Sequence, residues 1–264
     1  LEFRRVLFRS PGFFGAAVRY YIQLHPMPTH RRRSGWSFDI DQFEPIAMWL
    51  GKHQNALPKY VEVAFTGRTA DGKPSLGLGC TINGASDAEV ETGFKLFKEC
   101  PVLGKAKTSR ENFEPGPGGG GIIPGSRQVL DGVWSSAPPE KVIEAGRDAF
   151  TKLPTPQSFM LWLHWGPPHK LPDMAYSLQA DTYFSPNAIY YDEKDDARCA
   201  AWAKEVVDKF KPISVGSQMN DENMPSNNGP YLSKAAAEKL ERLRKKYDPD
   251  KRRSEEHTSE LQSH

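Results

Sequence analysis

The residues whose types could support chemistry do not assemble into a self-contained catalytic motif. The chain contains no GxSxG nucleophile elbow, no HExxH zinc motif and no Walker loop. His164 and His169 flank a Gly-Pro-Pro turn, which is a poor spacing for two ligands of one metal ion, so structural histidines are favoured over metal ligands. Asp195 and Asp196 stand where a helix is expected to begin, and the helix dipole accounts for two acids there without catalysis.

Charge and cysteine patterns exclude several classes of partner. The net charge of +2 is spread along the chain, which indicates neither nucleic acid nor a membrane surface. The one basic run, at residues 30–33, has no interleaved aromatics and is expected to be a solvated turn. No apolar run approaches the roughly 18 residues that span a bilayer. The three cysteines lie far apart without a CxxC pair, which disfavours a disulfide framework and a zinc site.

Residues 110–126 are rich in glycine and predict a low-complexity loop that divides the chain in two. A phosphate cradle is not expected, because no Gly-Lys-Ser/Thr follows the glycines and no helix begins after them. The content of 38% hydrophobic and 11% aromatic residues is typical of a globular protein with a sizeable core.

The elements that must position any functional side chain follow two periods. Apolar residues alternate in some segments, which predicts strands, and recur every three or four residues in others, which predicts helices. Strands are expected at residues 14–24, 36–40, 61–65, 76–82, 128–135, 159–165, 174–183, 188–191 and 213–218, and helices at 43–50, 87–98, 140–150, 194–210 and 233–247. The second half repeats the order of the first. About eight strands without regular βαβ alternation predict an α+β fold, a large and mostly antiparallel sheet with helices packed on one face.

The last predicted helix is amphipathic, with Leu240 and Leu243 in its apolar stripe, Ser233 as its N-cap and a turn after Asp248-Pro249. Its end, LERLRKKYDPD at residues 240–250, resembles the C-terminal signature of berberine-bridge-enzyme-like flavin oxidases. A second segment, PGFFGAAVRYYIQLHPMP at residues 11–28, is similar to the point where the flavin-binding domain of that family passes into its substrate domain.

The resemblance implies a division of the chain. Residues 11–28 would be the end of an FAD-binding domain, and residues 29–252 a substrate-binding domain whose berberine-bridge-like segment covers about residues 212–252. In the first segment the candidate cofactor contacts are Gly12, Phe13, Phe14 and Gly15, because a glycine turn lets backbone approach a ligand closely.

Two further stretches are similar to segments of the family that face the flavin. The first contains Tyr190 and Tyr191, of which only one can face the site, because neighbouring residues of a strand point to opposite sides. A phenol there can donate a hydrogen bond or act as a tuned base, so these two are the candidate catalytic residues. The second stretch, residues 215–221, offers the amides of Gln218 and Asn220 to the edge of the flavin.

Candidate substrate contacts come from the buried strand at residues 159–165. On that strand Trp162 and His164 alternate with Leu161 and Leu163, so they share one face of the expected sheet. We predict that these two side chains contact the substrate.

The resemblance implies the C-terminal half of an FAD-linked oxidase of the vanillyl-alcohol-oxidase, or PCMH-type, superfamily. FAD would accept a hydride from a small-molecule substrate, and O2 or another acceptor would reoxidise it. The FAD-binding half is expected upstream, so this chain alone is expected to be inactive. The rival interpretation is a non-catalytic α+β binding module whose signatures arise from ordinary helix and turn chemistry. No targeting peptide is visible and the true N-terminus is expected to be missing, so the compartment stays open, with the cytoplasm favoured.

The two ends of the chain are expected to be foreign to this fold. Residues 1–10, LEFRRVLFRS, can be written in codons whose reverse complement reads RSEEHTSELQ, which is the sequence of residues 253–262. A read flanked by the same sequencing adapter on both sides must show this relation, whereas a natural protein has no reason to. We therefore predict that residues 1–10 and 253–264 are translated adapter and take no part in the fold.

Overall fold

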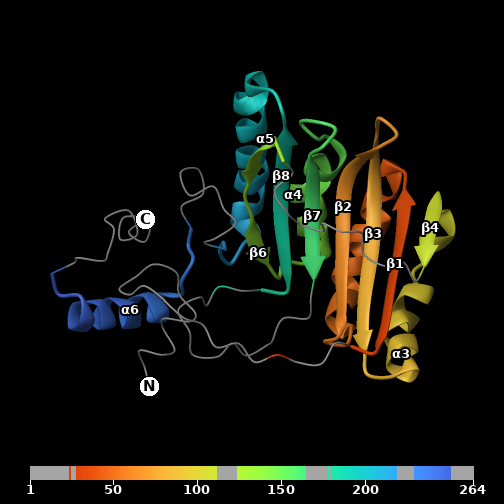
Figure 1. Ribbon diagram of the computed structural model, residues 1–264, viewed down its shortest axis with the longest axis horizontal. Coiled ribbons are helices and arrows are strands. Elements are labelled where there is room, and N and C mark those ends of the chain that lie inside the picture. The colour runs from red at the N-terminus through yellow and green to blue at the C-terminus, as the bar shows by residue number, and fades with distance from the viewer. Residues whose placement is uncertain are drawn as a thin grey trace.

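An eight-stranded sheet with helices on one face forms the body of the protein (Figure 1). This computed structural model describes residues 24, 28–111, 124–164, 178, 180–218 and 229–250. The predicted adapter segments and the predicted cofactor turn from Gly12 to Gly15 lie outside these residues.

Every strand pair in the sheet is antiparallel. The order across the sheet is β4-β1-β3-β2-β7-β8-β5, and β6 also pairs with β8. The strands are β1 (His30–Phe38), β2 (Val61–Ala70), β3 (Lys73–Gly84), β4 (Thr108–Glu111), β5 (Arg127–Leu130), β6 (Val133–Ser135), β7 (Phe159–His164) and β8 (Thr182–Tyr190). The predicted α+β class and the antiparallel sheet are confirmed.

Within the described residues, four α-helices pack against one face of this sheet, and a fifth lies apart from it (Figure 1). The helices are α2 (Phe43–His53), α3 (Asp87–Lys98), α4 (Pro139–Thr151), α5 (Asp196–Phe210) and α6 (Lys234–Tyr247). Short 3-10 turns are η1 (Ile40–Gln42), η2 (Gln54–Ala56), η3 (Leu103–Lys105), η4 (Glu193–Asp195) and η5 (Lys211–Ile213).

Aromatic side chains fill the layer between sheet and helices. Phe65 of β2 is fully buried, and its ring lies 6.0 Å from that of Phe43 on α2 and 5.1 Å from that of Phe150 on α4. Trp162 of β7 meets the same ring edge-on at 6.2 Å. Offset and edge-on aromatic contacts add about 0.5–1.5 kcal/mol each beyond area burial, so this cluster ties two helices to the centre of the sheet.

The two halves of the chain are arranged about the β2–β7 pairing. Apart from β4 and β5, each half supplies a strand, a helix, two strands and a helix in that order, and the sequence predicted such a repeat. In the sheet the first half runs β1-β3-β2 and the second runs β7-β8-β6, so equivalent strands lie at equivalent distances from the junction. An inexact twofold repeat therefore relates the halves.

Several predicted boundaries are wrong. The basic run at residues 30–33, predicted to be a turn, is the beginning of β1, where Arg32 lies over the ring of Phe94 at 3.6 Å. The strand β4 lies partly inside the predicted loop at residues 110–126. In the second half, the predicted strand at 128–135 is split into β5 and β6, and β8 continues through the predicted gap before residue 188. Charged or polar side chains hide the period-two signal at each of these places.

The C-terminal segment attaches at the β6 edge. The predicted strand at residues 213–218 is reduced to one bridge, in which the Trp134 N–H donates to the Gly216 carbonyl at 2.7 Å. Helix α6 follows with its predicted cap, because the Ser233 hydroxyl accepts from the Ala236 N–H at 3.2 Å. Leu240 and Leu243 of α6 pack in a small cluster with Tyr231 and Leu232. Among the described helices, none is both long and apolar enough to cross a bilayer.

Two strand glycines on opposite faces test the one-sided packing. A Cβ on Gly67 would lie 2.6 Å from the Phe150 Cα of α4, whereas a Cβ on Gly79 would meet nothing closer than the Ala64 carbonyl oxygen at 3.7 Å. We expect Gly67→Ala to lower the free energy of unfolding by about 1–3 kcal/mol or more through overpacking. Gly79→Ala should leave it unchanged or raise it by up to about 1 kcal/mol. Urea unfolding of both variants measures this, and equal losses would contradict an open second face.

Candidate functional site

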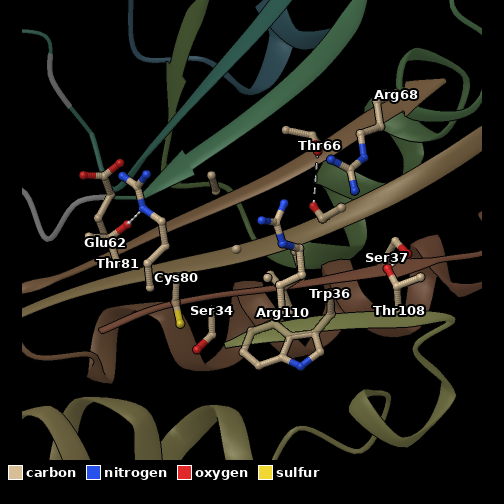
Figure 2. A pocket seen from close by; sticks show the side chains of 16 residues that line it. Ser34, Trp36, Ser37, Glu62, Thr66, Arg68, Cys80, Thr81, Thr108 and Arg110 are labelled. Atoms are coloured by element: carbon tan, nitrogen blue, oxygen red, sulfur yellow. Dashed lines mark hydrogen bonds between the residues drawn. The ribbon is translucent and has the colours of Figure 1, made fainter. Parts of the chain in front are cut away.

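The sheet face that the helices leave uncovered carries a groove of about 450 Å³ over strands β1 to β4 (Figure 2). Pleating sends alternate residues to the two faces, so the register decides which side chains reach it. Val63 and Phe65 point to the helices, whereas their neighbours Glu62, Ala64 and Thr66 line the groove. A volume of this size suits a small organic molecule.

The floor of the groove has very little side chain. Gly79 of β3 lies between Gly35 of β1 and Ala64 of β2 in one row across the sheet. In the next row, Gly77 lies beside Thr66, whose hydroxyl donates to the Gly77 carbonyl at 3.3 Å. These small residues let a flat group approach the backbone.

The rim of the groove is cationic. Arg33, Arg68 and Arg110 line it, with Glu62 as the one carboxylate among the lining residues. The Arg33 Nε donates to the Thr81 hydroxyl at 3.3 Å at one end of the groove. Figure 2 places Glu62 and Thr81 at that end, Arg68 at the other and Arg110 between them. The arrangement favours a ligand that carries negative charge.

The cysteine beside the groove is not suited to nucleophilic chemistry. The Cys80 side chain is 2% exposed, and burial raises the pKa of its thiol to about 12. The thiol therefore stays protonated at neutral pH. Because only the deprotonated thiolate is nucleophilic, Cys80 is unreactive. No cluster of metal ligands occurs in the described part of the chain.

Tyr190, the first candidate catalytic residue, belongs to a clip between the sheet and α5. Arg127 of β5 donates to the Asp196 carboxylate of α5 through two guanidinium nitrogens, Nε at 2.7 Å and Nη2 at 2.5 Å. The same carboxylate accepts from the Tyr190 phenol, and Arg127, followed by Tyr190, holds the pKa of Asp196 below its ordinary value. Burial, and then the Asp196 carboxylate, raise the pKa of Tyr190, so this phenol is a poor base. Its side chain packs with Ala188 and Cys199 on the helix side.

Tyr191, the second candidate, is placed differently. It follows the last residue of β8 and is 54% exposed. Of the two tyrosines, only this one is accessible to a ligand.

The two predicted substrate contacts lie on the helix side of the sheet. Trp162 is 1% exposed, and its Nε1 donates to Gln54 Oε1 at 2.9 Å, while the Gln54 amide nitrogen donates to the Thr182 hydroxyl at 2.8 Å. His164 is 3% exposed, and its Nδ1 is 2.8 Å from the Asp181 carbonyl oxygen. Both side chains are satisfied within the core and are separated from the groove by the sheet.

Of the two predicted amide contacts, Gln218 lies within the described residues and Asn220 does not. Gln218 is partly buried, and directly before it the Ser217 N–H donates to the Pro230 carbonyl at 2.9 Å. Asn220 lies outside the described residues. The segment that contains Gln218 therefore runs along β6, near the edge of the sheet opposite to the β4 edge.

Sequence reasoning missed the groove itself. The glycine face of β3 was visible as Gly77, Gly79 and Thr81 alternating with apolar residues, but nothing in the sequence brought arginines from three other strands to it. The alternation of glycine with leucine is the one local signal that could have indicated a flat, ligand-accessible sheet surface.

The comparisons with known proteins agree with this architecture. No protein-family model matches the chain. The FAD-linked oxidoreductase nodO of Hypoxylon pulicicidum is 26% identical over 252 residues, which cover 92% of this chain and 56% of that protein. The FAD-linked oxidoreductase ptmO of Penicillium ochrochloron is 30% identical over 263 residues, which cover 91% and 55%. The chain spans about half the length of the curated relatives it matches.

Solved structures share the fold. GilR, described as an oxidoreductase that catalyses the terminal step of gilvocarcin biosynthesis, matches with a TM-score of 0.65 at 14% identity, over 84% of this chain and 54% of that chain. BBE-like 1 of Physcomitrella patens matches with a TM-score of 0.63 at 11% identity, over 85% and 53%. The resemblance that the C-terminal pattern indicated is confirmed.

The buried His164 predicts a pH dependence of folding. Burial lowers the pKa of His164, although its contact with the Asp181 carbonyl opposes the shift. As the pH falls through about 6.5, His164 binds a proton in the unfolded chain more readily than in the folded chain. The free energy of unfolding should therefore decrease over this range. We expect His164→Asn to flatten this dependence between about pH 7.5 and 5.5, as measured by urea unfolding. His30→Asn, at the start of β1, is the control; a slope unchanged by His164→Asn would contradict the assignment.

Proposed function

We propose that the chain is the substrate-binding part of an FAD-linked oxidoreductase, and that the uncovered sheet face forms one wall of its active site. The observation that carries this proposal is the groove on that face, in a chain similar over 91–92% of its length to FAD-linked oxidoreductases. The remaining length of those relatives leaves room for a cofactor-binding part.

The described residues fit one wall of a flavin site. The floor around Gly77 and Gly79 admits a flat substrate close to the backbone, so that the substrate would lie between this floor and a flavin ring held opposite it, and Thr66 and Thr81 supply hydroxyl groups beside it. When bound, FAD supplies hydride acceptance from a carbon of a small organic substrate and passes the electrons to O2 or another acceptor. Most contacts to the cofactor are assigned to an upstream FAD-binding domain, together with residues 12–15.

Within this proposal the chain orients the substrate and handles a proton. The guanidinium groups at the rim hold the substrate over the glycine floor. Tyr191, exposed at the end of β8, does not line the groove; it is the candidate to hydrogen-bond the reacting group or accept its proton in a substrate that extends from the groove across β7 to β8. Gln218 and Asn220 remain candidates for amide hydrogen bonds to the edge of the cofactor.

The test uses a protein of the relatives' length, made by joining this chain to the upstream region of the same gene. We expect this longer protein to purify yellow with bound FAD and to reduce O2 or a dye when its substrate is present. A longer protein that stays colourless with added FAD would refute the oxidoreductase and favour a non-catalytic binding module.

The tyrosine assignment has its own measurement. In the longer protein, Tyr191→Phe should slow anaerobic flavin reduction by about 100-fold while flavin content stays the same, because a positioned acid–base group contributes about this much. Tyr190→Phe is the matched control. It should leave the reduction rate within about twofold and lower the free energy of unfolding by about 0.5–1.5 kcal/mol, the net value of one hydrogen bond. Unchanged reduction in Tyr191→Phe would remove the tyrosine from the mechanism and leave the oxidoreductase intact.

A further inference from the structure

We propose that the groove over β1 to β4 binds an organic anion, whose carboxylate or phosphate group is held by Arg68 and Arg110 and whose body lies across the glycine floor. This inference rests on the proposed function and narrows its substrate to molecules with a negatively charged group.

The groove carries an excess of positive charge. Three guanidinium groups and one carboxylate line it, so the lining carries two excess positive charges. Arginines on the helix side are neutralised by neighbours: Arg32 pairs with Glu91 and Glu111, and Arg127 pairs with Asp196. Arg68 makes no ion pair with any described residue. Gathering like charges in a groove costs free energy in the free protein, and an anionic ligand offsets that cost.

The guanidinium group of Arg68 lies over the glycine floor. A Cβ on Gly77 would lie 3.0 Å from the Arg68 Cζ and 3.1 Å from its Nε. The guanidinium therefore leaves its own strand, β2, and lies over β3 at a position where only glycine leaves room. Arg110 rises from β4 on the same face (Figure 2). Planar guanidinium groups bind carboxylate or phosphate with two parallel hydrogen bonds, which neutral donors cannot match.

The neighbouring strand indicates where the rest of the ligand lies. In the register of the sheet, Leu163 of β7 is opposite Ala64, and Leu161 is opposite Thr66, on the face that carries the groove. The surface thus changes from cationic over β4, β1, β3 and β2, where the three arginines lie, to apolar over β7. A ligand with an anionic end and an apolar body would contact both the arginines and the leucines. An uncharged ligand would contact favourably only the leucines.

Binding of a probe to the full 264-residue chain tests the inference without any flavin. The probe is 2-naphthoate, an apolar aromatic carboxylate, and 2-naphthamide is its uncharged counterpart of the same shape. We expect the chain to bind naphthoate at least tenfold more tightly than the amide, in calorimetry at low salt, and the preference to shrink as salt screens the charges. Equal binding of the two probes, or no binding of naphthoate at millimolar concentration, would overturn the inference.

Variants locate the binding. Arg68→Gln and Arg110→Gln should each weaken naphthoate binding by about 10- to 100-fold, as expected for one charge-assisted contact. Glu62→Gln removes the repelling carboxylate and should strengthen it several-fold. Arg198→Gln, which removes an arginine paired with Asp195 on α5, is the matched control and should bind like the unaltered chain. Naphthoate binding that Arg68→Gln and Arg110→Gln leave unchanged would mean that the anion binds elsewhere.

The outcomes separate this inference from the proposed function. A chain that binds naphthoate through Arg68 and Arg110, in a longer protein that never holds FAD, would support an anion site and refute the oxidoreductase. A yellow, active longer protein whose Arg68→Gln and Arg110→Gln variants keep the same KM for every substrate would support the oxidoreductase and refute the anion site. Inorganic phosphate and phenyl phosphate distinguish the two head groups, because only a phosphate site prefers them to naphthoate.

Discussion

Burial of the helix-covered face of the sheet is the constraint from which the rest of the structure follows. Helices α2 to α5 cover that face, and the backbone of α4 approaches β2 so closely that residue 67 can only be glycine without rearrangement. Because a strand alternates its side chains, every buried position fixes its neighbours on the other face. The aromatic cluster around Phe65 thus holds Ala64 and Thr66 in the groove, although the cluster itself lies on the other face of the sheet.

The inexact repeat explains why the groove lies over the first half alone. The two halves present equivalent strands to the uncovered face, but with different side chains. Over β1 and β3 these are Gly35, Gly77 and Gly79, which leave the surface hollow. In the second half, the rings of Trp134 and Tyr183 lie 5.0 Å apart at equivalent positions, and both are buried. The same architecture therefore supplies a packed surface on one side of the β2–β7 junction and a binding surface on the other.

The sequence predicted the elements that bury a clear apolar stripe and failed where burial depends on distant partners. The bounds of α3 agree with the predicted residues 87–98, because its first turn is capped by Ser86 and its Phe94 and Phe97 face the core. The beginning of β1 was missed because arginines at residues 31–33 carry no apolar period, yet Arg32 packs on Phe94 of α3. The groove could not be predicted for the same reason. Its guanidinium groups come from β1, β2 and β4, and only the register of the folded sheet brings them together.

The distribution of reactive groups indicates how the chemistry is divided. Burial keeps the Cys80 thiol protonated, and Tyr190 is committed to the clip with Asp196 and Arg127. Beside the groove, the described residues offer hydroxyl groups, guanidinium groups and one carboxylate, which orient and neutralise a ligand but cannot accept electrons. Under the proposed function, a cofactor held opposite the groove would supply the chemistry, and this chain would contribute orientation and charge. That division would account for a stable core on the helix face of the sheet and a hollow, charged surface on the other face over β1 to β4.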